Sequence, residues 1–174
     1  ILSSPVLSAS KMQQLENLAD PAFQMTRIDL NYDASLELAA AIKAICEQVA
    51  SSIRAGFTLI VLSDKNIEAD KVPANAIMVT GAVHHYLIAQ GIRTDANLII
   101  ETGLARDSHQ VAVLIGFGAT CVYPYLAYDV IDDLVATGEL LGDPIQARVN
   151  FRKGLDKGLL KILSKMGIST IVSY

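Results

Sequence analysis

The chain has 174 residues, enough for a single domain with a substantial hydrophobic core. Apolar residues make up 52% and charged residues 18%, a balance that excludes intrinsic disorder and indicates that part of the surface is normally covered. The net charge of -4 argues against a general nucleic-acid binder, and no apolar run reaches the roughly 18–20 residues of a membrane span.

Short β-branched runs alternate along the chain with longer segments of helical period. Strands are expected at residues 5–7, 23–30, 57–62, 97–100, 121–123 and 169–172. Residues 57–62 are apolar on both faces, as in a parallel strand that helices cover on each side. This alternation predicts an α/β fold of three layers, with a mainly parallel β-sheet flanked by helices.

Helices fill the intervals between the expected strands. The clearest begins at Asp33 or Ser35, either of which can cap free backbone N–H groups, and runs to Arg54. Further helices are expected at residues 75–90, 108–117 and 126–135. Residues 140–144 contain a glycine and a proline and predict a turn or linker.

Residues 145–166 predict a basic amphipathic helix. Six basic side chains stand there against Asp156 alone, a net charge of +5 that leaves -9 for the rest of the chain. Its apolar stripe favours packing against the same domain or a neighbouring one, and salt-sensitive binding of an acidic partner is an alternative. We expect residues 1–143 to form the α/β domain and residues 144–174 to form a basic helix and strand that follow it.

Glycines, cysteines and histidines offer few signs of a reactive site. Gly116 and Gly118 close a predicted helix and lead into a strand, which indicates a tight turn, because a phosphate-binding loop must open a helix. Cys46 and Cys121 have neither metal-site nor disulfide spacing and are expected to be reduced core thiols. The three histidines (His84, His85 and His109) lack metal-ligand spacing and are interpreted as partly buried or interface residues.

Polar side chains follow the carboxyl ends of the predicted strands, where open α/β sheets bind their ligands. Asp64 and Glu101 each follow or end such a strand, and Arg106 and His109 lie near the start of the next helix, within possible reach of Glu101. These four residues are the candidate pocket or interface. They could bind a small polar ligand, or they could brace loops and contact another domain.

Three groups of residues in chain order carry a resemblance to a known family. They are RIDLNY (27–32) with LIVLSD (59–64); GAVHHYLI (81–88) with LIIETG (98–103) and PYLA (124–127); and KGLLK (157–161) with SKMGIST (164–170). Together they resemble the central domain of glutamate synthase over nearly the whole chain. Tyr86, Gln110 and Tyr123 stand where family members often have histidine, histidine and asparagine.

The resemblance implies a parent enzyme that contains FMN and an iron–sulfur cluster and makes glutamate from glutamine and 2-oxoglutarate. A glutaminase domain would release ammonia, which would travel to an FMN barrel for the amination and reduction. The family's nucleophile, flavin-binding residues and cluster cysteines lie outside this segment, so no catalytic, cofactor-binding or metal residue is expected here. The implied partners are the glutaminase and FMN domains, in a bacterial cytoplasm or a plastid stroma.

Two functions follow as hypotheses. The first is a non-catalytic central domain that links the two catalytic domains, helps to form the ammonia path and leads through residues 144–174 toward the FMN barrel. The alternative is a freestanding flavin- or phosphate-binding enzyme that uses Asp64, Glu101, Arg106 and His109. The chain starts at Ile1 without a methionine, which suggests a piece of a longer protein. Self-association of such a piece is possible, because its surface would normally be covered.

Overall fold

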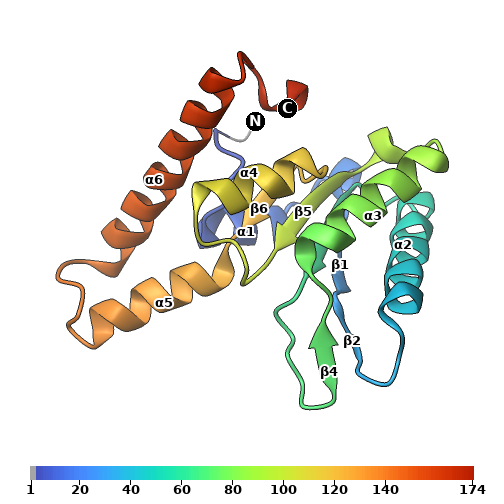
Figure 1. Cartoon of the computed structure of the whole chain (residues 1–174), viewed down its shortest axis with the longest axis horizontal. Helices are drawn as coiled ribbons and strands as arrows, with labels where there is room; N and C mark the ends of the chain where they lie inside the picture. Colours follow the sequence, from blue (N-terminus) through green and yellow to red (C-terminus); the bar gives the residue numbers. More distant parts are fainter. Residues whose placement is uncertain (1–2) are drawn as a thin grey trace.

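Four strands form a parallel sheet in the order β1-β3-β5-β6 in the computed structural model, which describes residues 3–174. They are β1 (Met25–Asp29), β3 (Leu59–Ser63), β5 (Asn97–Glu101) and β6 (Cys121–Tyr123). Each crossover in the chain leads to the adjacent strand, so that the sheet grows in sequence order (Figure 1). The expectation that the chain is a piece of a longer protein was based on Ile1, and Ile1 lies outside the described residues.

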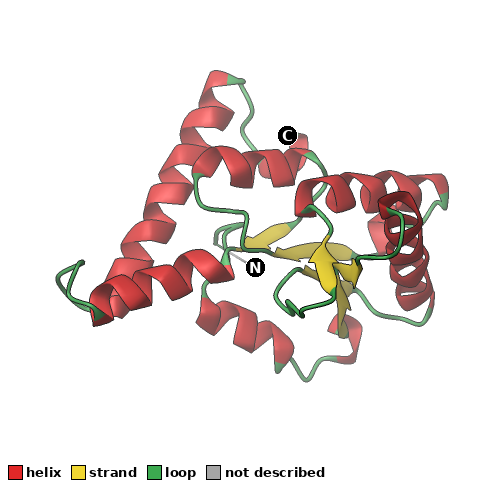
Figure 2. Cartoon of the chain, turned by 60° about the horizontal axis from the view of Figure 1, so that its bottom comes forward, coloured by secondary structure: helices red, strands yellow, loops and turns green. Residues whose placement is uncertain are grey.

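Six helices accompany the sheet in the described part of the chain: α1 (Ala9–Glu16), α2 (Leu38–Arg54), α3 (Ala76–Ala89), α4 (Ser108–Gly116), α5 (Tyr125–Ala136) and α6 (Pro144–Lys165). Single 3-10 turns occur at η1 (Pro21–Phe23), η2 (Arg93–Asp95) and η3 (Ile171–Ser173). Figure 2 shows helices on both sides of the sheet, which confirms the predicted three-layer α/β fold. None of the helices within residues 3–174 is long and apolar enough to cross a bilayer.

The two faces of the sheet have different cores because side chains alternate along each strand. Ile60 and Ile100 point toward α2, α3 and α4 and belong to the main hydrophobic core. Val61 and Ile99 point the other way and pack with Met12 of α1 in a smaller core. Right-handed crossovers between neighbouring strands return on the same side, so α2, α3 and α4 share one face, while α1 lies on the other with Leu7 of the N-terminal segment.

Helix α6 packs onto the main core through Leu155 and Leu159. It crosses the start of α4 at Gly158, where an added Cβ would clash with Cβ and Oγ of Ser108. A glycine therefore costs helix propensity but allows the two helices to approach. The division of the chain between residues 143 and 144 stays a prediction, although these contacts join α6 closely to the α/β core.

The predicted strand at residues 169–172 is wrong, because the chain forms the turn η3 there. Tyr174 at the end of this segment packs against the main core instead of the sheet. The open edge of β6 is taken by the N-terminal segment, in which Val6 forms a single parallel bridge with Val122. That bridge is all that remains of the strand expected at residues 5–7.

Two regular elements were not anticipated, namely α1 and an antiparallel ribbon of β2 (Asn31–Asp33) and β4 (Lys71–Pro73). The ribbon projects from the carboxyl edge of the sheet (Figure 1). Helix α2 begins only at Leu38, because the Asp33 carboxylate accepts the backbone N–H of Ser35 at 2.8 Å in the turn that ends β2. Helices α3, α4, α5 and α6 begin and end within two residues of their expected limits.

Candidate functional site

The carboxyl ends of the parallel strands bring several polar side chains together on the face that α1 covers. Ser63, Glu101 and Tyr123 are consecutive neighbours across β3, β5 and β6. They point toward α1 because they lie an even number of positions from the apolar residues of the smaller core. Together with Arg27 and Glu16 they line a cavity of about 610 Å³ between α1 and the sheet.

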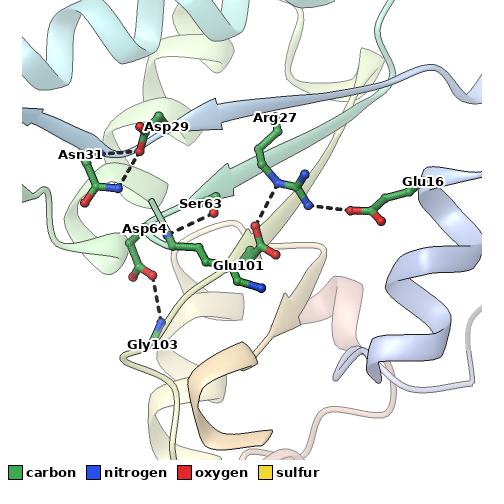
Figure 3. A network of polar contacts seen from close by, with 9 residues as sticks. Glu16, Arg27, Asp29, Asn31, Ser63, Asp64, Glu101 and Gly103 are labelled. Carbon is green, nitrogen blue, oxygen red and sulfur yellow. Dashed lines mark hydrogen bonds and ion pairs between the residues drawn. The ribbon is translucent and has the colours of Figure 1, made fainter. Parts of the chain in front are cut away.

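Arg27 joins two carboxylates in this cavity (Figure 3). Its Nε donates to Oε2 of Glu101 at 3.0 Å, and its Nη2 donates to Oε1 of Glu16 at 2.6 Å. Partial burial opposes the charged guanidinium, but the two carboxylates outweigh it and raise the pKa of Arg27. The Glu101 side chain is only 3% exposed. The positive charge of Arg27 compensates the cost of burying this carboxylate.

Asp64 is the centre of a second polar cluster, just beyond β3. The hydroxyl of Thr102 donates to its Oδ2, and the backbone N–H of Gly103 donates to its Oδ1 at 3.0 Å. The hydroxyl of Tyr125 also faces this carboxylate, and burial first and the Asp64 charge second raise the pKa of Tyr125. Asp64 therefore braces the end of β5 and the start of α5.

A further carboxylate, Asp29 at the end of β1, lies just before the β2–β4 ribbon. Its Oδ1 accepts the backbone N–H of Asn31 at 2.9 Å and the side-chain amide of the same residue at 2.7 Å (Figure 3). The Oδ1 atom of Asn31 is buried without a partner among the described residues. These bonds hold the first residue of the ribbon against the sheet.

The structure does not assemble the four candidate residues into one cluster. Glu101 binds Arg27, whereas Asp64 binds the loop that follows β5. Arg106 and His109 are exposed, and neither takes part in an ion pair within residues 3–174. The sequence reasoning missed Arg27 as the partner of Glu101, although an arginine inside a predicted strand of an apolar sheet was an available signal.

The glycine turn before β6 is confirmed. Helix α4 ends at Gly116, and Gly118 adopts a φ of +114° that favours glycine. The backbone N–H groups of Gly118 and Ala119 donate to carbonyl oxygens of α4 at 3.0 Å each. Because these N–H groups are already bonded, the turn does not fit a flavin phosphate.

The two cysteines lie on opposite faces of the sheet, Cys46 in the main core and Cys121 in the smaller core. Both are buried and free, as expected. Burial raises the pKa of Cys46, and it raises the pKa of Cys121 to about 11. Iron–sulfur clusters are held by several thiolates around one centre, so this pair does not fit such a cluster. No group of three potential metal-binding side chains occurs in the described part of the chain.

His84 has a structural role at the other end of the sheet, near the residues that precede β5 and β6. Its Nδ1 accepts the Nε–H of Arg93 at 2.9 Å, and Arg93 also donates to the carbonyl oxygens of Ala96 and Gly118. Burial, then the charge of Arg93, then His85 lower the pKa of His84. His84 is thus a partly buried, hydrogen-bonded histidine, as the sequence indicated, while His85 is exposed.

Comparisons with known proteins identify relatives over the whole chain. The family model described as the glutamate synthase central domain matches residues 1–174. The chain is 36% identical over 180 residues to glutamate synthase [NADH] of Schizosaccharomyces pombe, covering 99% of the chain and 8% of that protein. It is 35% identical over 173 residues to the glutamate synthase [NADPH] large chain of Bacillus subtilis, covering 99% of the chain and 11% of the relative.

A third relative comes from a plant. The chain is 36% identical over 187 residues to the chloroplastic ferredoxin-dependent glutamate synthase of Oryza sativa, covering 99% of the chain and 12% of that protein. The chain therefore spans about a tenth of the length of these curated relatives.

Proposed function

The chain belongs to the glutamate synthase central domain family, and on that premise we propose that it is a non-catalytic connecting domain. It links a glutaminase domain to an FMN-binding domain and helps to form the protected path of ammonia between them. The match of the whole chain to the central domain model carries this proposal. Relatives that extend far beyond the matched segment have room for both catalytic domains.

The contacts at the carboxyl edge support a bracing role. Arg27 ties β1 to β5 and α1, and Asp64 ties the end of β3 to the loop after β5. Each carboxylate is thus committed to a partner within the domain. Such contacts hold the loops and α5 in one arrangement, which a spacer between two active sites requires.

FMN and the iron–sulfur cluster belong to other parts of the parent in this proposal. The bonded N–H groups of the Gly118 turn and the separation of Cys46 from Cys121 support that assignment. In the parent, FMN supplies the reducing chemistry, and the residues of this chain contribute position and exclusion of water. We place the parent in a bacterial cytoplasm or a plastid stroma, because its relatives include bacterial and chloroplastic enzymes.

The test measures coupling in the intact glutamate synthase that contains this segment. Arg27→Gln and Asp64→Asn loosen the bracing contacts, whereas Lys43→Gln removes only an exposed pair with Glu47 and is the control. We expect both variants to hydrolyse glutamine but to release more free ammonia and form less glutamate per glutamine consumed. The control should keep the parent's ratio.

Two results would refute the non-catalytic assignment, and a third would refute the role in the ammonia path. One is glutamine hydrolysis, or glutamate formation from 2-oxoglutarate, ammonia and a reductant, by residues 1–174 alone. The other is tight FMN binding by the purified chain, seen as yellow flavin absorbance, which would favour the freestanding enzyme. An unchanged coupling ratio in both bracing variants would refute the role in the ammonia path.

A further inference from the structure

Helix α6 carries a row of lysines on the side that faces away from the core. This lysine stripe consists of Lys153, Lys157, Lys161 and Lys165, all of them exposed. The buried side chains of the helix are Leu155, Leu159 and Leu163. Each lysine lies two positions from a buried leucine, a rotation of about 200° around the helix axis. The stripe therefore stays opposite the packed face along about 18 Å of helix.

The stripe has no acidic partner within residues 3–174. The five ion pairs there use other side chains, and the pair that α6 forms joins Arg148 to Asp132 of α5 at 3.1 Å. Asp156, the acidic residue among the lysines, accepts a hydrogen bond from Ser4 at 2.6 Å. Like charges four residues apart on a helix repel one another and weaken the helix. The isolated domain thus carries a repulsion that an acidic partner would relieve.

An exposed leucine lies beside the lysines. Leu160 is 65% exposed and lies one helical turn from Lys157, on one side of the stripe. An exposed apolar side chain beside a row of charged ones matches the apolar anchor and polar rim of a protein interface. A membrane-surface helix would instead present a broad apolar face, and the chain outside residues 145–166 carries a net charge of -9 that disfavours polyanions.

We propose that the lysine stripe, with Leu160 beside it, docks on an acidic protein surface of another domain in the same glutamate synthase polypeptide. This inference rests on the proposed connecting function. The curated relatives support the choice of occupant, because this segment makes up only 8% to 12% of their length. The rest of such a polypeptide is permanently close to α6 and is the nearest source of a partner surface.

The experiment uses the intact glutamate synthase that contains residues 1–174. An amine-acylating reagent measures the exposure of each lysine, and a carbodiimide couples lysines directly to carboxylates in contact with them. We expect the stripe to be acylated roughly fivefold more slowly than the exposed Lys11 and Lys43, with the difference disappearing near 1 M salt. Cross-links should join the stripe to Asp or Glu outside this segment.

A charge-neutral variant provides the matched comparison. Lys153→Gln, Lys157→Gln and Lys161→Gln together should increase hydrogen exchange in the cross-linked partner region, while Lys11→Gln, Lys43→Gln and Arg54→Gln together should not. Acylation of the stripe at the rate of the control lysines would overturn the proposal. So would cross-links only to a second copy, or salt-sensitive retention on RNA or phosphatidylserine vesicles that the stripe variant loses.

These readouts are independent of the ammonia path. If the coupling ratio does not respond to the bracing variants but the stripe cross-links to another domain, the proposed function fails and the docking surface stands. If coupling responds and the stripe is freely acylated, only the docking surface fails.

Discussion

The two faces of the sheet are built in opposite ways. On one face, α2, α3, α4 and α6 bury an apolar core that includes Ile60 and Ile100. On the other face, the short helix α1 buries mainly Met12 against Val61 and Ile99, and the sheet carries the ion pair of Arg27 and Glu101. Figure 2 shows this contrast as a thick helical layer on one side and a thin one on the other.

The contrast shows how strand order determines the cover of a sheet. When each crossover leads to the adjacent strand, all crossover helices return on one side, and the other side depends on segments outside the crossovers. Here that side relies on α1 and on one arginine between two carboxylates. We call the face covered by α2, α3, α4 and α6 the helical face and the other the α1 face. We expect packing on the helical face to contribute most of the free energy of unfolding, and the contacts on the α1 face to be more adaptable.

The largest expected effect compares two neighbouring isoleucines of β5. Ile100→Ala leaves a cavity in the helical core and should lower the free energy of unfolding by about 3–4 kcal/mol. Ile99→Ala should cost about 2 kcal/mol, because Ile99 borders a cavity of about 530 Å³ on the α1 face. Urea denaturation of both variants measures the difference. Equal losses would contradict the proposed asymmetry of the two faces.

A second comparison tests how closely α6 belongs to the helical face. Gly158→Ala forces a methyl group against Ser108 and should lower the free energy of unfolding by about 2 kcal/mol. Gly154→Ala meets nothing within 4 Å and should raise it by about 0.5–1 kcal/mol through helix propensity. Thermal unfolding of the pair is the measurement. A stabilising Gly158→Ala would mean that α6 does not rest on α4.

On the α1 face, Arg27→Gln leaves the buried Glu101 carboxylate without its cation. We expect a loss of about 1–2 kcal/mol, less than for a fully buried pair, because the Arg27 side chain is 41% exposed. Lys43→Gln should change stability by less than about 0.5 kcal/mol and is the control. Amide hydrogen exchange in α1 should become faster in Arg27→Gln and stay unchanged in Lys43→Gln. Unchanged exchange in Arg27→Gln would argue against a stabilising role of Arg27 between Glu16 and Glu101.

The smallest effect concerns pH and His84. Its pKa is lowered in the folded chain, so below about pH 6.5 the unfolded state takes up a proton that the folded state resists. The free energy of unfolding should therefore decrease as pH falls through this range and level off below the folded pKa. His84→Gln should remove this slope, whereas His109→Gln, at an exposed position, should keep it. Denaturation curves from pH 5 to 8 decide between them.

Much of the fold followed from local patterns. The apolar run in β3, the Asn75 cap of α3 and the glycine turn after α4 each specify their element within a few residues. The segment at residues 169–172 has equal β-branched character, yet it forms η3. Ile171 of this segment packs against the main core, and Val6 already occupies the edge of β6.

The candidate pocket or interface stays a prediction. The rule that ligands gather at the carboxyl ends of parallel strands selects Asp64 and Glu101 for it, and both are buried in the fold. It could not choose their partners. Glu101 binds Arg27, which is 74 positions away in the chain, and Arg106 close by in sequence remains exposed. Sequence proximity is a poor guide where three strands converge.

The sequence by itself determined the class of the fold, the family and the basic character of α6, because these depend on composition, periodicity and motifs that are read locally. Only the tertiary structure decided which face of the sheet is thinly covered, which carboxylate receives the arginine and which side of α6 is free. Those outcomes depend on strand order and on the packing of distant segments, and no local pattern encodes either.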